Sequence, residues 1–470
     1  MYLKKIIILF TIIFIPLLLI AQSDTIKYDV SLSSTVSNGA YSTFWLQSNR
    51  YGIVSSSPQS SFLSTKISKD YGNSQRNFDY GFIANFLMRT DNQKKEFFFH
   101  ELYAKGKVYL FDFAVGFKEE IFGNQDSTLS AGGFLHSTNS QPIPKIFVGL
   151  ENYTPLPNTK DIEIKGGVSH GFFKDNVYVK DMLYHHKYLN VRIKATDYRL
   201  WFEFGLDHSA EWGGILPGDV KKSTTLTDFM KIFFGRGGSE ESLQSEQINA
   251  LGNHLVSQSV KIEGQAGDYK ISGYWQNLSE DGPIILIWNS MNVRDGLWGF
   301  SVKNNQFPII KGFLYEYLSA TDQSGPYHDK DGIIYGGNDS YFSNGIYLSG
   351  WTYYGRTMGT PLITSPLYNK DGFVGVTNNR VRAHHLGIEG DVVGYKYRLL
   401  STFSENYGLN KVKFKPMKPN TSLLLEVNKT FPKLWNLEGK LSLAADFGTL
   451  FGNSTGCMFS IRKTGDIFKY

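Results

Sequence analysis

The sequence predicts an all-β chain that forms a transmembrane antiparallel β-barrel of about 18 strands, with long extracellular loops and a short helical hairpin insertion. Three observations lead to this fold class. The N-terminus has the features of an export signal. Apolar and polar residues alternate over runs of nine residues or more, and short connections alternate with long ones.

Residues 1–21 have the pattern of a secretory signal peptide. Lys4 and Lys5 precede an apolar run, and Ala21 supplies the small residue before an expected cleavage site at Gln22. No cysteine follows the apolar run, which excludes a lipoprotein signal. An uncleaved membrane anchor is the alternative. We expect residues 22–470 to form one barrel in the bacterial outer membrane.

The composition excludes several other classes of protein. Hydrophobic residues make up 41% of the chain and charged residues 19%, which argues against disorder. Beyond the N-terminus, no apolar run approaches the roughly 18 residues of a membrane-spanning helix. The single cysteine, Cys457, excludes internal disulfides and cysteine-based zinc clusters. The net charge of +5 is too weak and too dispersed to indicate a nucleic-acid partner.

The period-two pattern is clearest between residues 189 and 207. Apolar and polar residues alternate over 189–195, a turn follows at Thr196 and Asp197, and the alternation then resumes. Strands in soluble proteins are usually about five or six residues long, whereas these runs reach the length that a tilted strand needs to cross a bilayer. Similar pairs of strands are expected over 256–275, 381–403 and 423–447.

The connections between the expected strands fall into two classes. Tight turns are expected near 104–107, 196–197, 265–268, 304–308, 390–392 and 431–436. Long polar connections are expected over 121–142, 211–253, 278–295, 321–378 and 405–419. Periplasmic turns and extracellular loops differ in this way in outer-membrane barrels. The expected partners therefore include outer-membrane lipids, and the terminal Tyr470 suits the barrel assembly machinery.

Two helical signals form an insertion at about 223–253. Leu226, Phe229, Met230 and Phe233 share one apolar stripe at helical spacing. A second helix is expected to run from an N-cap at Ser239 to about residue 251, after a glycine-rich break. The insertion is either a hairpin that decorates a loop or a plug at the mouth of the barrel.

No motif makes a convincing case for chemistry. Two strings match G-x-S-x-G, at 167–171 and 452–456, but neither leads from a strand into a helix as a nucleophile elbow requires. Neighbours in a strand point to opposite faces, so neither His185-His186 nor His384-His385 can chelate one metal by itself. The segment 329–332 lacks the spaced ligands of an EF-hand. We expect no catalytic residues, no metal and no cofactor.

Several long strings resemble the capsule-assembly Wzi family, in its Bacteroidetes branch. They include FWLQSNRYG (44–52), PIPKIFVGLENYTPLPNTKDIEIKGGVSHGFF (142–173), YEYLSATDQSGPYHD (315–329) and GIYLSGWTYYGRTMGTPL (345–362). The resemblance covers most of the exported chain. It implies a lectin-like outer-membrane barrel that holds capsular polysaccharide at the cell surface during assembly.

The longest expected connection, about 321–378, concentrates aromatic and amide side chains. Sugar rings present an apolar C–H face and an edge of hydroxyls, so aromatic rings beside amides and carboxylates suit them. The alternative is that these aromatics form the girdle at the membrane interface. We favour the girdle for Trp351 and the loop for Tyr341. The candidate glycan-binding residues are Tyr327, Tyr335, Asn338, Asp339, Tyr341, Trp351, Tyr353 and Tyr354.

Three functions are compatible with such a barrel. The first is a non-enzymatic protein that binds capsular or other surface polysaccharide and supports capsule assembly and attachment. The second is a porin or a specific sugar-transport channel, which needs an open lumen. The third is a barrel enzyme, for which the sequence offers no persuasive triad. An inward row of polar residues is compatible with the first two: Arg192, Lys194, Arg199, Glu203 and Asp207.

Overall fold

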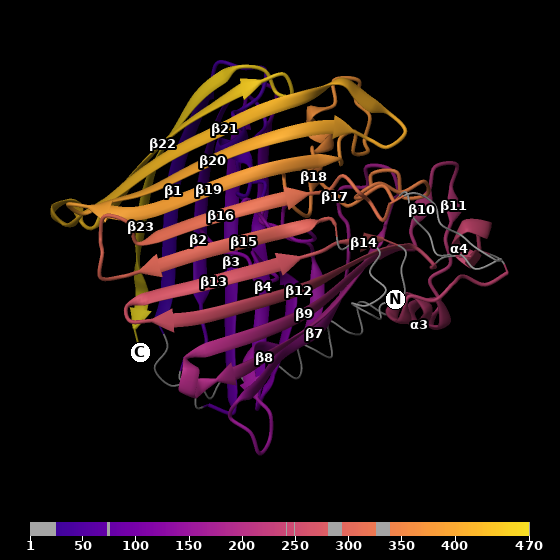
Figure 1. The fold of residues 1–470 in the computed structure, drawn as a ribbon, viewed down its shortest axis with the longest axis horizontal. Coiled ribbons are helices and arrows are strands. Elements are labelled where there is room, and N and C mark those ends of the chain that lie inside the picture. Colours follow the sequence, from indigo (N-terminus) through magenta and orange to yellow (C-terminus); the bar gives the residue numbers. More distant parts are fainter. Residues whose placement is uncertain are drawn as a thin grey trace.

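The computed structural model describes residues 25–72, 76–240, 242–248, 250–280, 294–325 and 339–469. Within them, one antiparallel sheet closes on itself (Figure 1). The sheet contains 19 strands, and one of these, β14 (Ser279–Glu280), is a short side pairing on β12. The other 18 form the ring, which closes where the first strand pairs with the last. The predicted fold class and strand number are therefore confirmed.

The barrel strands follow one another around the ring in chain order. They are β1 (Thr25–Ser37), β2 (Gln59–Lys69), β3 (Phe78–Asp91), β4 (Lys95–Val108), β5 (Phe111–Phe117), β6 (Lys145–Pro155), β7 (Ile162–Phe172), β8 (Leu183–Ala195), β9 (Leu200–Trp212), β12 (Asn253–Ala266), β13 (Tyr269–Gln276), β15 (Gly296–Asn304), β16 (Gly312–Ser319), β19 (Val381–Val392), β20 (Tyr395–Gly408), β21 (Lys413–Phe431), β22 (Leu437–Gly448) and β23 (Ser454–Lys469).

The remaining elements are short and belong to the connections. They are α2 (Phe44–Gln47), η1 (Thr196–Tyr198), β10 (Ile215–Leu216), β11 (Val220–Lys221), α3 (Leu226–Phe234), α4 (Gln244–Ile248), β17 (Thr352–Tyr353), β18 (Arg356–Thr357), η3 (Pro366–Tyr368) and η4 (Pro432–Leu434). Among the described residues, no helix is long and apolar enough to span a bilayer.

Side chains alternate between the lumen and the outer surface, as a period of two requires. On β8 and β9, Leu189 and Phe204 are exposed on the outside, whereas Asn190 and Glu203 line a pocket inside the barrel. An apolar exterior around a polar interior reverses the arrangement of a soluble protein and is what a lipid environment demands. The expected inward direction of Arg192 and Asp207 is confirmed, because both line that pocket.

The long connections all lie at one end of the barrel. Figure 1 shows β10, β11, β17, β18, α3 and α4 together at one end, beyond the strand tips. The other end has tight turns, such as residues 267–268 between β12 and β13 and residues 393–394 between β19 and β20. We call the first end the loop end and the second the turn end.

Three expected features of the connections are wrong. Residues 104–107 lie inside β4, and the turn comes just after it. The segment 405–419 is not a long loop, because β20 and β21 continue to Gly408 and Lys413 and form an extended hairpin. The second helix of the insertion begins at Gln244 rather than at Ser239 and is only 5 residues long.

The first helix of the insertion, α3, is built as its sequence predicts. Thr225 is its N-cap and forms a capping box with Asp228, and Gly235 ends it in a left-handed conformation with φ of 60°. Helix α3 is not a plug. Phe229 packs on His170, His185 and Trp212, whose side chains point outward from β7, β8 and β9. The helix therefore lies against the outer wall at the loop end.

Candidate functional site

The lumen is filled at the loop end by three connections that fold inward. We call them together the plug: residues 38–58 with helix α2, residues 118–144, and the described parts of 320–380. Their apolar side chains form one buried cluster with the inner wall, and Phe44, Trp45, Phe134, Tyr341 and Trp351 are each at most 3% exposed. The barrel therefore has a hydrophobic core at a level where an open pore would hold water.

Buried polar side chains of the wall hold the plug in place. Glu316 on β16 accepts hydrogen bonds from the Ser130 hydroxyl at 2.6 Å and from the Ala131 backbone N–H at 2.7 Å. The Gln276 side chain on β13 accepts from the backbone N–H of Phe134 at 3.0 Å. Because buried polar groups are costly when unpaired, these contacts favour one seated position of the 118–144 segment.

Three of the candidate glycan-binding residues lie in this core. Tyr341 and Trp351 are 0% exposed and Tyr353 is 1% exposed. The Tyr341 hydroxyl donates to the Asp295 carboxylate at 3.2 Å, and its ring meets Phe134 edge to face. The aromatics of the long connection thus fold inward here. These three side chains pack inside the barrel and do not form a membrane girdle, and Tyr341 is buried against Phe134 of the 118–144 segment. Their role in glycan binding stays a prediction.

Two of the other candidates belong to the described residues. Asp339 accepts a hydrogen bond from Ser324 at 2.5 Å within the plug. Tyr354 is 46% exposed at the loop end, and its backbone N–H donates to Asp175 at 2.8 Å. Tyr327, Tyr335 and Asn338 lie outside the described residues, as does the segment 329–332. Their role in glycan binding stays a prediction.

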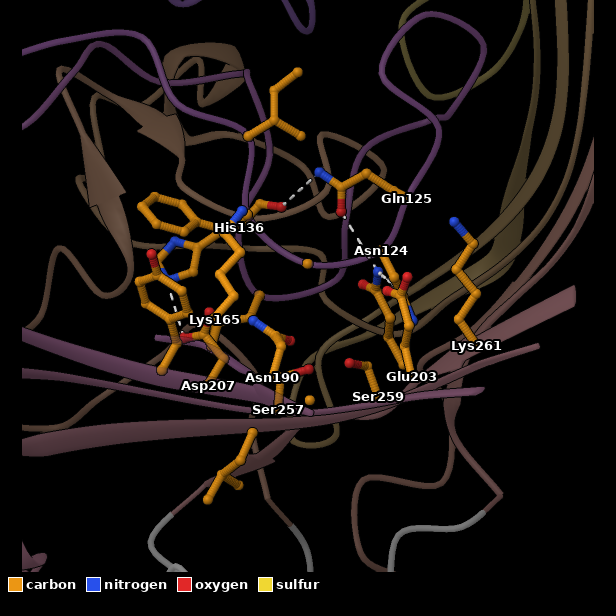
Figure 2. A pocket seen from close by; sticks show the side chains of 18 of the residues that line it. Asn124, Gln125, His136, Lys165, Asn190, Glu203, Asp207, Ser257, Ser259 and Lys261 are labelled. Carbon is orange, nitrogen blue, oxygen red and sulfur yellow. Dashed lines mark hydrogen bonds and ion pairs between the residues drawn. The ribbon is translucent and has the colours of Figure 1, made fainter. Parts of the chain in front are cut away.

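A polar pocket of about 210 Å³ lies in the lumen beneath the plug (Figure 2). The 118–144 segment contributes Asn124, Gln125 and His136 to it. Figure 2 shows these side chains facing inward-pointing residues of β7, β8, β9 and β12. Asn190, Ser257 and Ser259 supply uncharged hydrogen-bonding groups on the wall side, and Lys165, Glu203 and Lys261 supply charges.

At one side of this pocket, two histidines and a carboxylate converge. His136 Nε2 lies 3.4 Å from Asp207 Oδ1, and His186 Nε2 lies 3.0 Å from the same oxygen. The ligand atoms of the three residues lie within 4.8 Å of one another, so they could hold a divalent metal ion. They also have protein partners without a metal, since His186 Nε2 is hydrogen-bonded to Asp207 and His136 Nε2 is hydrogen-bonded to Ser209 Oγ at 3.0 Å. The sequence expectation of no metal is left open.

The structure places the two histidine pairs and the two G-x-S-x-G strings as the sequence predicts. Of the neighbouring histidines, His186 and His385 point into the lumen, whereas His185 contacts helix α3 outside and His384 contacts Tyr315. Residues 167–171 lie within β7, and residues 452–456 run from a connection into β23. Neither serine therefore occupies a turn from a strand into a helix.

A second and larger cavity, about 1050 Å³, lies at the loop end between the plug and strand β4. We call it the outer groove. Small-molecule sites usually measure about 300–1,000 Å³, so the outer groove has room for an extended ligand that the lumen pocket lacks. Its lining combines aromatic rings with charges of both signs: Arg89, Glu96, Phe97, Phe99, Lys174, Asp175, Tyr353, Tyr354 and Arg356.

Two cations of the outer groove have no carboxylate partner among the described residues. Lys174 Nζ lies 4.0 Å from the centre of the Phe117 ring, and burial lowers its pKa. Arg356 is buried and donates to the Val54 carbonyl at 2.8 Å and to the Gln47 side chain at 3.1 Å. Burial lowers the pKa of Arg356 to about 10, so it stays charged at neutral pH. Both cations line the outer groove, where Arg356 is only 6% exposed.

A known family matches the chain over residues 30–377, and it is described as "Capsule assembly protein Wzi". The chain belongs to the Wzi family of capsule assembly proteins. The resemblance seen in the sequence is thereby confirmed at the level of the family, and the closed barrel is an outer-membrane protein. No curated protein matches the chain.

Solved structures share the fold at low sequence identity. Wzi of Escherichia coli, described as an outer-membrane carbohydrate-binding β-barrel involved in group 1 capsule assembly, has a TM-score of 0.57 at 11% identity, covering 92% of this chain and 84% of that one. OccK2 of Pseudomonas aeruginosa in complex with glucuronate has a TM-score of 0.51 at 8% identity, covering 95% and 98%. OccK5 of Pseudomonas aeruginosa has 0.50 at 11%, with the same coverage.

Sequence reasoning missed most of the residues that line the two cavities. Lys174 and Asp175 lie in a short polar stretch with no motif, Arg356 lies in a string noted only for the family resemblance, and the 121–142 connection was expected only as a loop. One signal was available: Phe97, Phe98 and Phe99 form an unbroken aromatic run in a strand that otherwise alternates. Such a run departs from the period of two, and the structure places it beside the outer groove.

Proposed function

We propose that this Wzi-family barrel binds surface polysaccharide in the outer groove and so supports the assembly and attachment of a capsule. The observation behind this proposal is the groove's position and size: about 1050 Å³ at the loop end, the end expected to face the medium. A polysaccharide outside the cell can reach that end without crossing the membrane.

The lining of the outer groove suits an acidic saccharide. The exposed ring of Tyr354 can stack against the C–H face of a sugar. Lys174 offers a charged donor to carboxylate or phosphate groups, and such charge-assisted hydrogen bonds are stronger than neutral ones. Arg356 adds its positive charge to the lining. Asp175 adds a carboxylate that can accept hydrogen bonds from sugar hydroxyls, and burial raises its pKa.

The filled lumen argues against the alternative of a porin or sugar channel. A channel needs a continuous aqueous path, but buried aromatic residues of the plug occupy the lumen at the loop end. Catalysis is not part of the proposal, because neither G-x-S-x-G serine has the setting of a nucleophile.

Deleting the gene tests the proposal. Polysaccharide synthesis should continue while attachment weakens, so that glycan moves from the cell fraction to the medium. Complementation with Tyr354→Ala combined with Lys174→Gln should reproduce the loss of attachment. Trp435→Ala is the matched control, because Trp435 is 84% exposed at the turn end. Loss of total glycan, instead of its redistribution, would indicate a biosynthetic enzyme and contradict the proposal.

A further inference from the structure

The barrel wall is incomplete beside the outer groove. Strand β5 pairs with β4 only as far as Leu102 opposite Phe117, and β6 pairs with β5 only from Lys145 onward. Strand β4 continues to Lys95 and pairs there with β3. Among the described residues, no strand pairs with the other side of β4 over residues 95–101.

The chain leaves the wall at this point because it turns inward. After Phe117, the 118–144 segment enters the lumen as part of the plug, and the Glu119 side chain meets His100 at 2.9 Å. The next wall element at this height is the β7–β8 connection, where Lys174, Asp175 and Val177 line the far side of the outer groove. The plug residues Tyr354 to Arg356 form its inner side.

An unpaired strand edge is unusual in a transmembrane barrel. Closure of the sheet normally pairs every backbone N–H and C=O, since lipid offers no hydrogen bonds. A gap near the loop end is tolerated where water or a polar ligand can reach the edge. The outer groove supplies that polar space directly behind the gap.

The lining of the outer groove changes character from outside to inside. Phe97, Phe99 and Leu102 are 61%, 48% and 44% exposed and belong to the outward face of β4. Phe99 meets Phe86, which is outward on β3, edge to face. This face is continuous with the apolar exterior, whereas the far side presents the cation Lys174 and the inner side presents the cation Arg356. One end of the groove therefore suits acyl chains and the other suits anions.

We propose that the gap is a lateral opening through which the outer groove takes an outer-leaflet glycolipid with an acidic saccharide head. The acyl chains lie against Phe97 and Phe99, and the head reaches Lys174 and Tyr354 through the wall, in a groove to which Arg356 adds positive charge. This inference rests on the proposed function, because it identifies the ligand of the same groove as a saccharide still attached to its membrane anchor.

Site-specific photo-crosslinking tests lateral entry in the full-length protein. The protein carries p-benzoylphenylalanine at Phe99 and is reconstituted in phosphatidylcholine vesicles that contain purified lipopolysaccharide with phosphorylated sugars. Phe459 is the matched control, since it is 53% exposed on the outward face of β23. Crosslinks to lipopolysaccharide should be several-fold more frequent at Phe99 than at Phe459. Equal yields at the two positions would overturn the proposal.

Variants distinguish binding of the lipid anchor from binding of the sugar. Phe97→Ser with Phe99→Ser should reduce binding of lipopolysaccharide several-fold but leave binding of lipid-free acidic polysaccharide unchanged. Lys174→Gln should weaken both by about tenfold, the effect of losing one charge-assisted contact. Unchanged lipopolysaccharide binding by the double serine variant, in a protein that keeps its heat-resistant mobility in detergent, would overturn lateral entry.

Failure of the proposed function gives a different result. If the unaltered protein binds no lipid-free polysaccharide and deletion of the gene leaves capsule attachment normal, the proposed function is wrong. The crosslinking ratio at Phe99 still decides whether the groove accepts a glycolipid from the bilayer.

Discussion

Tyr341 was proposed from the sequence as a glycan-binding residue, but the structure places it in the buried core of the plug. It is fully buried between the 118–144 segment and the wall, and its hydroxyl donates to Asp295. We predict that Tyr341→Ala destabilises the plug by about 3 kcal/mol or more, as for a core aromatic. Protease sensitivity of the loops in detergent measures this effect.

A matched pair controls this prediction. Tyr341→Phe keeps the ring and removes one hydrogen bond, so it should cost only about 1 kcal/mol. Tyr354→Ala truncates a tyrosine that is 46% exposed and should barely change protease sensitivity. Equal sensitivity of Tyr341→Ala and Tyr354→Ala would contradict the assignment of Tyr341 to the core.

For single residues, the sequence predicted the face of the strand to which a side chain points better than it predicted which side chains it contacts. Alternation alone placed His185 and His186 on opposite faces, because that depends only on strand geometry. It could not predict that His186 meets His136, since the two residues are brought together by the inward fold of a separate connection. The burial of Tyr341 depends on the same distant contacts.

Helix α3 is an element whose two apolar sides have different neighbours. Phe229, Ile232 and Phe233 pack toward the wall, whereas Leu226, Met230 and Phe234 are 77%, 44% and 53% exposed. The stripe predicted from Leu226, Phe229, Met230 and Phe233 is thus divided between two faces. An amphipathic helix on the outer wall of a barrel is well placed to lie in the headgroup region of the bilayer.

We predict that a nitroxide at Met230→Cys is reached by dissolved oxygen more readily than by a water-soluble nickel complex when the protein is in a bilayer. Cys457→Ser provides the background without native cysteine. A label at Lys221→Cys, in the exposed strand β11, is the control and should show the reverse preference. Equal water accessibility of the two labels would place α3 above the membrane.

The 118–144 segment is held by ion pairs that depend on pH. Burial alone raises the pKa of Glu120, but Lys145 and Lys118 outweigh it and hold that pKa below its usual value of 4.5. Burial also raises the pKa of Asp126, but Lys303, whose Nζ lies 2.5 Å from Asp126 Oδ2, outweighs it and lowers that pKa. A carboxyl with a lowered folded pKa stabilises the fold fully above its unfolded pKa and loses that contribution as the pH falls.

We therefore predict that cleavage within 118–144 by an acid-stable protease increases as the pH is lowered from 7 through the usual carboxyl value of 4.5. Glu120→Gln should raise cleavage at neutral pH and flatten the pH profile. The control is Glu438→Gln, a glutamate near the turn end that lies beside Arg462 and away from the plug. A pH profile that Glu120→Gln leaves unaltered would exclude this ion pair as the cause.

Over the whole molecule, the ring of strands was predictable and the content of the lumen was not. Alternation and connection length report on local geometry, so they gave the barrel, the number of strands and most of the turns. They failed over 405–419, where two strands extend beyond their apolar span and polar residues continue the hairpin. Whether a long connection projects outward or folds inward depends on contacts across the ring, such as His385 with the Leu129 carbonyl at 2.7 Å.

The filled lumen has an electrical consequence. An open barrel of this strand number conducts ions through its aqueous interior, as porins of 16–18 strands do. We predict that the purified protein in a planar bilayer shows no large, stable channels, because the plug occupies the loop end.

Glu316→Ala should produce intermittent openings. It removes the acceptor of the Ser130 and Ala131 hydrogen bonds and leaves those donors unpaired. Glu438→Ala, an inward glutamate that does not contact the plug, should stay silent. Large stable channels in the unaltered protein would show that the plug leaves the lumen, and they would favour a transporter over a binding protein.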